Sequence, residues 1–174
     1  MNRIVSIAII GTLGLSVAGG AQALDMPKRK SGLWELKTNT SNSSKPNTMH
    51  MCVDEQTDDM LTNMGSGMGK KMCSKNELRK EGNKYIAESV CSFGSSTATT
   101  HSVFTGDFTT AYRGESKSTY QPPMMGMSEA TTEIEAKWTG PCKPGQKPGD
   151  VIMADMPAGM PALNLKDLHK MFKE

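Results

Sequence analysis

Four cysteines constrain the fold of this chain most strongly, because two of them predict the alignment of one hairpin. The segment from Cys73 to Cys91 has a turn signal, Glu81-Gly82-Asn83, at its centre. In a hairpin centred on Gly82, Cys73 lies opposite Cys91, at a separation that a disulfide can bridge. The sequence therefore predicts a Cys73–Cys91 disulfide inside an antiparallel hairpin.

The same alignment predicts that Leu78 lies opposite Ile86, and it leaves Cys52 and Cys142 as the second pair. That second disulfide would tie an early strand to the end of the last one. The alternative is a thiolate metal site or a redox pair. No Cys-x-x-Cys motif is present, and only His50 lies close to a cysteine in the sequence. Structural disulfides are therefore the preferred interpretation.

The first residues predict export, which suits disulfides. Arg3 precedes an apolar run, Ile4–Val17, and the small residues Ala21-Gln22-Ala23 form a typical cleavage site. Residues 1–23 are thus predicted to be a cleaved signal peptide. The alternative, a membrane anchor, is less well supported, because the run is shorter than the roughly 20 residues of a spanning helix. Export predicts an oxidising, periplasmic location without nucleic acid as a partner, and no transmembrane span in the mature chain.

The mature chain, residues 24–174, is predicted to form a single β-rich domain. Its 19 basic and 18 acidic residues, counted without Arg3, nearly balance, which argues against polyanion binding. Aromatic residues make up 5% of the chain and hydrophobic residues 36%, so the core is expected to be thin and to benefit from disulfides. The basic cluster Lys28-Arg29-Lys30 is interpreted as a solvated lead-in.

Polar and apolar residues alternate with period two through most of the chain. Trp34 and Leu36 share one face of a strand, and Ile134, Ala136 and Trp138 share one face of another. We predict about seven strands in an antiparallel meander that forms a barrel, a half-barrel or a sandwich. Further strands are expected at residues 84–93, 97–104 and 109–120.

Two segments break the alternation. Residues 54–72 predict a short Met-rich helical insertion, although Gly65, Gly67 and Gly69 weaken it by about 1 kcal/mol each. Residues 162–173 predict an amphipathic C-terminal helix that packs on the sheet. Between the last strand and that helix, residues 140–150 are expected to be extended and irregular.

Several motifs together resemble a known family. They are Gly32-Leu33-Trp34-Glu35, Cys52, Cys73, Cys91-Ser92, the run from His101 to Asp107, and Gly140 to Asp150. With them the chain resembles the exported bacterial proteins grouped as domain of unknown function 3617. The resemblance implies a periplasmic protein of a Gram-negative bacterium, and it implies no catalytic residue.

Methionine is unusually frequent, with 15 residues in the chain. Three interpretations are open: packing in a core that is short of aromatic residues, an adaptable apolar surface for a partner or lipid or a sink for oxidants, and soft-metal binding. Thioethers favour Cu(I) or Ag(I), which makes Cu(I) the possible cofactor; otherwise none is expected. The candidate metal ligands are Met49, His50, Met51, Met60, Met64, Met68, Met124, Met125 and Met127.

Catalytic motifs are weak. His101 and Asp107 could hydrogen-bond across a turn, but no serine lies in a Gly-x-Ser-x-Gly motif. We therefore expect no enzyme. The leading hypothesis is a non-enzymatic binding module for an apolar ligand or an envelope protein, and the alternative is a Met-rich Cu(I)/Ag(I)-binding protein. A ligand carrier would line its cavity with strand residues such as Trp34, Ile134 and Trp138.

Overall fold

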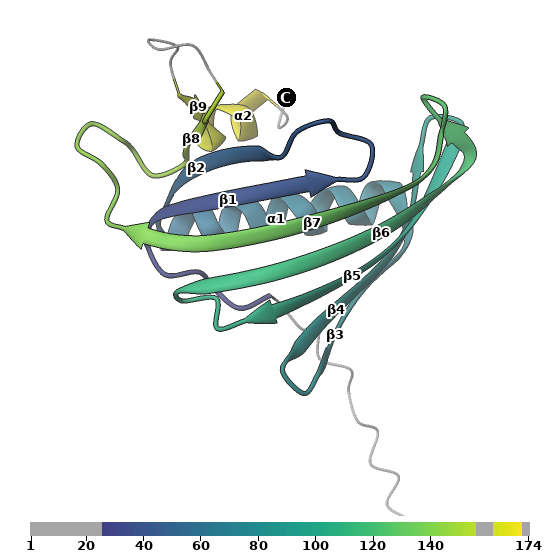
Figure 1. The fold of residues 1–174 in the computed structure, drawn as a ribbon, viewed down its shortest axis with the longest axis horizontal. Helices are drawn as coiled ribbons and strands as arrows, with labels where there is room; N and C mark the ends of the chain where they lie inside the picture. The colour runs from purple at the N-terminus through teal and green to yellow at the C-terminus, as the bar shows by residue number, and fades with distance from the viewer. Residues whose placement is uncertain (1–25, 156–161, 172–174) are drawn as a thin grey trace, which may run out of the picture.

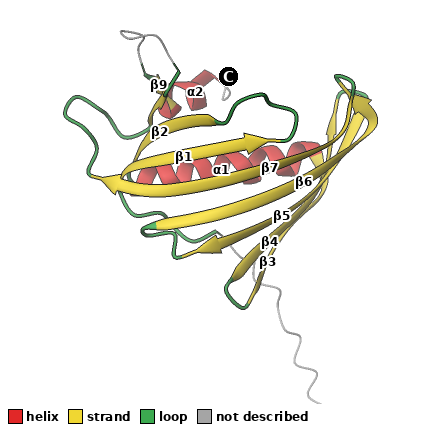
Figure 2. Ribbon diagram, in the orientation of Figure 1, coloured by secondary structure: helices red, strands yellow, loops and turns green. Residues whose placement is uncertain are grey.

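The computed structural model describes residues 26–155 and 162–171, and these form one open, antiparallel, nine-stranded sheet with two helices (Figures 1 and 2). The strand order is β3-β4-β5-β6-β7-β1-β2-β8-β9. The strands are β1 (Gly32–Thr40), β2 (Asn47–Val53), β3 (Cys73–Glu81), β4 (Lys84–Phe93), β5 (Ser96–Gly106), β6 (Ala111–Met124), β7 (Met127–Gly140), β8 (Asp150–Met153) and β9 (Leu163–Asn164). The helices are α1 (Glu55–Met72) and α2 (Leu165–Met171).

Helix α1 crosses one face of the sheet. It connects β2 to β3, and five strands lie between these two in the sheet. An α-helix of 18 residues is about 27 Å long. The six spacings from β2 to β3, at about 4.8 Å each, add to a similar length of about 29 Å. Figure 1 shows α1 lying behind β1 and β7, so the helix spans the sheet as a strap. We call the covered surface the helix-side face and the opposite surface the outer face.

The hydrophobic core lies under the first turns of α1. Trp34 is completely buried there and packs with Met51, Val53 and Ala136. Met60 and Leu61 of α1, Leu165 of α2 and Tyr112 of β6 complete the cluster. We call this end of the sheet the core end. The turns between β1 and β2, β4 and β5, and β6 and β7 lie at the other end, which we call the tip end (Figure 1).

The predicted hairpin forms, but with a different register. Glu81 pairs with Lys84 around the two-residue turn Gly82-Asn83, where Gly82 has a φ of +59°, which glycine adopts at low cost. This turn places Leu78 opposite Ala87, and Ile86 opposite Arg79, so the predicted Leu78–Ile86 pair is wrong.

A bulge between Cys73 and Lys75 then shifts the register of β3 by one residue. Cys73 returns to a position opposite Cys91, and the two sulfur atoms lie 2.02 Å apart. The sulfur atoms of Cys52 and Cys142 lie 1.96 Å apart. Both predicted cysteine pairs are therefore at disulfide distance.

The predicted mainly-β antiparallel class is confirmed, and the sheet does not close into a barrel. It has nine strands among the described residues, rather than about seven, because β8 and β9 are short additions at one edge. The C-terminal helix covers fewer residues than predicted. Residues 1–23, the predicted signal peptide, lie outside the described residues, and neither described helix is long and apolar enough to cross a membrane.

The basic lead-in is bound to the protein, and the prediction that it is solvated is wrong for Arg29. Arg29 Nε lies 2.7 Å from Asp58 Oδ1 at the start of α1. Lys28 contacts Glu55 and Asp59 of the same helix at 3.2 and 3.1 Å. The lead-in therefore fastens the first turns of α1 to the rest of the fold.

Candidate functional site

The two faces of the sheet differ completely in charge. In β1, β2 and β4–β7, residues that share a face with Trp34 in the strand register include no charged side chain. The outer face of the same strands carries all of their charges. These outer residues, with the histidines included, are Glu35, Lys37, His50, Lys84, Glu88, His101, Arg113, Glu115, Lys117, Glu129, Glu133, Glu135 and Lys137. The helix-side face of these six strands is thus uncharged from the core end to the tip end, and Lys80 of β3, opposite Tyr85, lies at its edge.

Beyond the core, small and hydroxyl-bearing side chains line the helix-side face. Ala98 and Ser102 are buried there. Hydroxyl groups pair across neighbouring strands. The pairs are Ser102 with Ser116 at 2.6 Å, Thr100 with Ser118 at 2.8 Å, and Thr40 with Thr132 at 3.3 Å. In each pair one hydroxyl donates to the other, so part of the hydrogen-bonding capacity of this face is satisfied within the face itself.

Aromatic side chains border this surface on its core-end side. Trp34 lies 5.8 Å from Tyr112, and Tyr112 stacks on Phe108 at 5.0 Å between ring centroids. Burial raises the pKa of the Tyr112 hydroxyl above its usual range. Tyr112 is therefore neutral at physiological pH.

Helix α1 begins with a well-formed cap. Asp54 accepts a hydrogen bond from the Thr57 backbone N–H at 2.7 Å, and Thr57 Oγ1 accepts one from the Asp54 N–H at 2.9 Å. Burial raises the pKa of Asp54, but the hydrogen bonds that the Thr57 hydroxyl and backbone N–H donate to its carboxylate outweigh burial, so the pKa is lowered overall. The cap and the bound lead-in hold the first turns of α1 firmly.

Covalent links flank both ends of the same helix. Cys52 precedes α1 by three residues and pairs with Cys142, and Cys73 follows α1 directly and pairs with Cys91. The later turns of α1 contain Gly65, Gly67 and Gly69, which lower helix stability in the stretch between these anchors. The strap is thus fixed at both ends and intrinsically weak in its second half.

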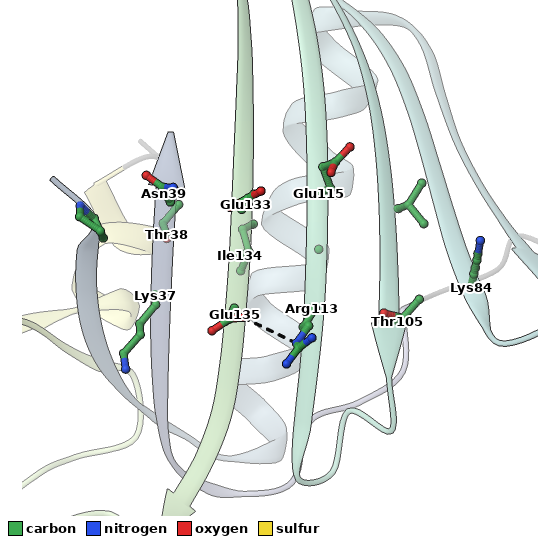
Figure 3. A pocket seen from close by; sticks show the side chains of 13 residues that line it. Lys37, Thr38, Asn39, Lys84, Thr105, Arg113, Glu115, Glu133, Ile134 and Glu135 are labelled. Atoms are coloured by element: carbon green, nitrogen blue, oxygen red, sulfur yellow. Dashed lines mark ion pairs between the residues drawn. The ribbon is translucent and has the colours of Figure 1, made fainter. Parts of the chain in front are cut away.

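A hollow lies on the outer face (Figure 3). It has a volume of about 760 Å³, and Figure 3 shows its charged side chains in front of the strands with the helix behind them. Arg113 Nε contacts Glu135 Oε1 at 3.6 Å. Both side chains are mostly exposed, so the pair contributes little binding energy. The hollow is the solvated surface of a curved sheet, with charges of both signs on its rim.

Strong hydrogen bonding lowers two carboxyl pKa values elsewhere. Lys75 at 2.6 Å and Arg79 at 2.7 Å lower the pKa of Glu88 on the outer face to about 2. Hydrogen bonds from Thr110, Ala111 and Thr109 hold the pKa of Asp107 well below its usual range. Both groups stabilise local strand and turn structure.

The structure divides the candidate metal ligands between separate places. Met49, Met51 and Met60 pack in or against the core, which supports the packing interpretation for these three. His50 lies on the outer face, with its Nε2 3.3 Å from Glu35 Oε2, so it points away from its methionine neighbours as strand geometry requires. The side chains of Met64 and Met68 lie outside the described part of the chain.

The remaining candidate ligands, Met124, Met125 and Met127, lie at the tip end, far along the sheet from the core. Met124 and Met127 are cross-strand neighbours in the β6–β7 hairpin, and Met125 is 92% exposed at its turn. The Met127 sulfur accepts a hydrogen bond from Asn42 Nδ2 at 3.2 Å. The structure therefore brings the 124–127 methionines together, and it separates them from Met49, Met51 and Met60.

His101 and Asp107 do not form the hydrogen bond that their spacing allowed. His101 is exposed in the middle of β5, opposite Lys117. Asp107 is a turn residue whose oxygens accept hydrogen bonds from the backbone N–H groups of Thr109, Thr110 and Ala111. The two residues therefore serve the strand and the turn separately.

Sequence reasoning missed the uncharged helix-side face as a continuous surface. The alternation of polar and apolar residues predicts which residues of a single strand face inward. Only the strand order places the inward residues of different strands side by side. Of the residues expected to line a ligand cavity, Trp34 is enclosed in the core and Trp138 donates a hydrogen bond to the Ser31 carbonyl. Ile134 lies on the helix-side face between Thr38 and Gly114.

Comparison with known proteins gives one match. A family model described as "Protein of unknown function (DUF3617)" matches residues 29–142, well over half of the chain. No curated protein and no solved structure matches it. The matched range extends from Arg29, at the anchor of α1, to Cys142, the last cysteine, and so includes both cysteine pairs and the strap. The chain therefore belongs to the DUF3617 family of proteins of unknown function.

Proposed function

We propose that this protein is a non-enzymatic binding module of the bacterial periplasm that holds an apolar ligand between the second half of α1 and the sheet. The observation that carries the proposal is the absence of charge from the helix-side face of β1, β2 and β4–β7. A face that only had to pack one helix could tolerate charge beyond the helix contact, whereas a surface for an apolar molecule could not.

The distribution of side-chain size supports the same location. Large residues fill the core end, where Trp34 and Met51 pack against α1. Toward the tip end, Thr38, Ser116 and Ser118 are small and only half-buried. In the second half of the strap, Gly69 is buried and has no side chain of its own. Small residues on the sheet and a buried glycine on the strap support a ligand site at this end rather than at the core end.

The anchoring of α1 also suits a role as a gate over the ligand. Its ends are anchored, so the weak second half can open without displacing β2 or β3. Segments of low local stability are those that move when ligands enter a protein. An apolar ligand would then be covered by the strap after entry, which would exclude water from it.

The proposal is tested by matched substitutions on β6. Ser118 is half-buried on the helix-side face, and its neighbour Lys117 is exposed on the outer face. Ser118→Leu should fill the space and weaken binding of the apolar dye N-phenylnaphthylamine by about tenfold. Lys117→Leu adds the same side chain on the other face and should leave dye affinity unchanged. Fluorescence titration of the oxidised mature protein measures the dye affinity of both variants, and thermal melts verify that each variant is folded.

Two outcomes would reject the proposal: a wild-type protein that does not bind the dye, or equal effects of the two substitutions. A native mass spectrum of protein purified from its own periplasm provides an independent test. A co-purifying organic mass on the wild type, reduced on Ser118→Leu, is the expected result.

Soft-metal binding is the alternative, and the pairing of Met124 with Met127 favours it over a purely structural role for these residues. If the hairpin binds Cu(I), the native mass should rise by one copper on addition of Cu(I) and resist a competing chelator. Replacing Met124 and Met127 by Leu, which keeps their bulk, should abolish that copper adduct.

A further inference from the structure

We propose that the tip end of the sheet docks on the surface of an anionic phospholipid bilayer, with Met125 and Phe93 as the inserted side chains. The basis is a combination of exposure, backbone strain and charge at this one end. The surface lies at the tip end of the sheet, and the proposal does not depend on the ligand proposed to bind the helix-side face.

Exposed apolar side chains gather at the tip end. Met125 is 92% exposed, and Phe93 is 42% exposed. They belong to adjacent turns, because Phe93 pairs with Ser96 at the β4–β5 turn and the next residue, Thr97, pairs with Gln121 of β6. Figure 1 shows the β4–β5 and β6–β7 turns both at the upper right of the view.

A shallow hollow continues the surface between these turns and the body of the sheet. It has a volume of about 510 Å³ and is lined by Tyr120, Gln121, Pro122, Pro123 and other residues next to the turn. Residues 120–128 contain no charged side chain, and neither do residues 91–100. Apolar and aromatic residues without charge are typical of segments that enter the headgroup region of a bilayer.

Met125 is a poor choice for the stability of its own turn. Met125 and Gly126 have φ values of +50° and +80°, the combination of a two-residue turn in which Asn-Gly is the preferred pair. A methionine backbone is strained at a positive φ, and the exposed apolar side chain is unfavourable in water. A residue that is unfavourable in both respects is understandable if the side chain is buried when the protein docks.

The charges around this end have the sign that anionic headgroups attract. Lys45 is exposed in the β1–β2 turn, whose Asn42 contacts Met127 of the hairpin. Lys71 is exposed in the last turn of α1, which leads into the Cys73–Cys91 pair next to Phe93. The nearest carboxylate along the hairpin, Glu129, lies on the outer face. Lysines around an apolar tip are the arrangement expected for docking on an anionic leaflet.

The experiment is flotation of the oxidised mature protein with vesicles of phosphatidylethanolamine and phosphatidylglycerol, compared with vesicles of phosphatidylcholine alone. We expect binding to the anionic vesicles that weakens with added salt. Met125→Asn should relieve the turn strain and raise thermal stability, yet lower vesicle affinity about tenfold. This variant separates docking from folding, because a folding defect would lower thermal stability as well as vesicle affinity.

Two further variants complete the test. Lys45→Gln with Lys71→Gln should lower affinity for anionic vesicles by about fivefold for each charge and leave phosphatidylcholine unaffected. Leu163→Ser is the matched control, because Leu163 is 50% exposed at the far edge of the sheet. The proposal fails if the wild type does not float with anionic vesicles, if Met125→Asn floats equally well, or if Leu163→Ser loses as much. It also fails if the tip substitutions abolish self-association in the absence of lipid, which would identify a second copy as the occupant.

Discussion

Arg29 and Asp58 form a nearly buried ion pair that joins the lead-in to α1. Their side chains are only 11% and 8% exposed, and Asp58 also accepts a hydrogen bond from the Arg29 backbone N–H at 2.8 Å. A charge in such a place is tolerated only while its partner is present. The pair therefore makes docking of the strap dependent on one residue of the lead-in.

Replacing Asp58 by Asn should destabilise the protein by about 3–5 kcal/mol, because the Arg29 charge stays buried without a counter-charge. Asp59→Asn is the adjacent control. Asp59 contacts Lys28 at 3.1 Å, but the two side chains are about half exposed, so its loss should cost less than about 1 kcal/mol. Urea denaturation of both variants measures the difference, and similar costs would show that burial of the pair is unimportant.

Two glycines of α1 should respond oppositely to alanine. Gly67→Ala should raise the free energy of unfolding by up to about 1 kcal/mol, because a methyl group there meets no atom within 4 Å and alanine favours helix. Gly69→Ala places its methyl group against the side-chain amide of Asn76 and should give no gain or a loss. Denaturation midpoints at unchanged m-value report both effects, and a gain for Gly69→Ala would contradict the close packing of α1 on β3.

The two cysteine pairs should contribute unequally to stability. The Cys52–Cys142 pair closes a separation of 90 residues and the Cys73–Cys91 pair one of 18. Chain entropy predicts losses of about 4.5 and about 3 kcal/mol when each pair is replaced by serine. Each pair is replaced as a unit, so that no free thiol remains, and calorimetry compares the two variants. The reverse ranking would show that local packing of the hairpin dominates.

Glu88 should stabilise the outer face in a defined pH range. Its pKa is lowered in the folded protein to about 2, first by Lys75 and then by Arg79. The folded state therefore binds fewer protons than the unfolded chain below the ordinary pKa of glutamate. The resulting stabilisation is complete above about pH 5 and is lost as the pH falls through about 2. Melting temperatures of wild type and Glu88→Gln should differ at neutral pH and converge near pH 2. A constant difference would exclude ionisation as its cause.

Local patterns predicted the parts of the fold that depend on nearby residues. Alternation around Trp34 and Ile134 predicted antiparallel strands, and the turn signal at Gly82 predicted the hairpin and its cysteine pair. The register inside that hairpin was wrong for Leu78 and Ile86. A bulge adds one residue without a distinctive composition, so spacing alone cannot reveal it.

Contacts between distant residues decided the remaining features. Arg29 and Asp58 are 29 positions apart, and no periodicity links a basic lead-in to the first turn of a helix. The uncharged helix-side face emerges only when the strand order places β1 beside β7. For the same reason, Met49, Met51 and Met124 looked equivalent in the sequence, although two of them lie with the core and one lies at the tip end.

The anchoring of α1 by cysteines on both sides has a consequence for proteolysis. A cut anywhere between Asp54 and Met72 separates the chain into two pieces, but Cys52 on the first piece is bonded to Cys142 on the second. A nicked molecule would therefore run as a single species on a gel without reductant and as two fragments after reduction. The strap, like the turns between β3 and β7, can therefore be severed while every strand remains covalently joined to the rest.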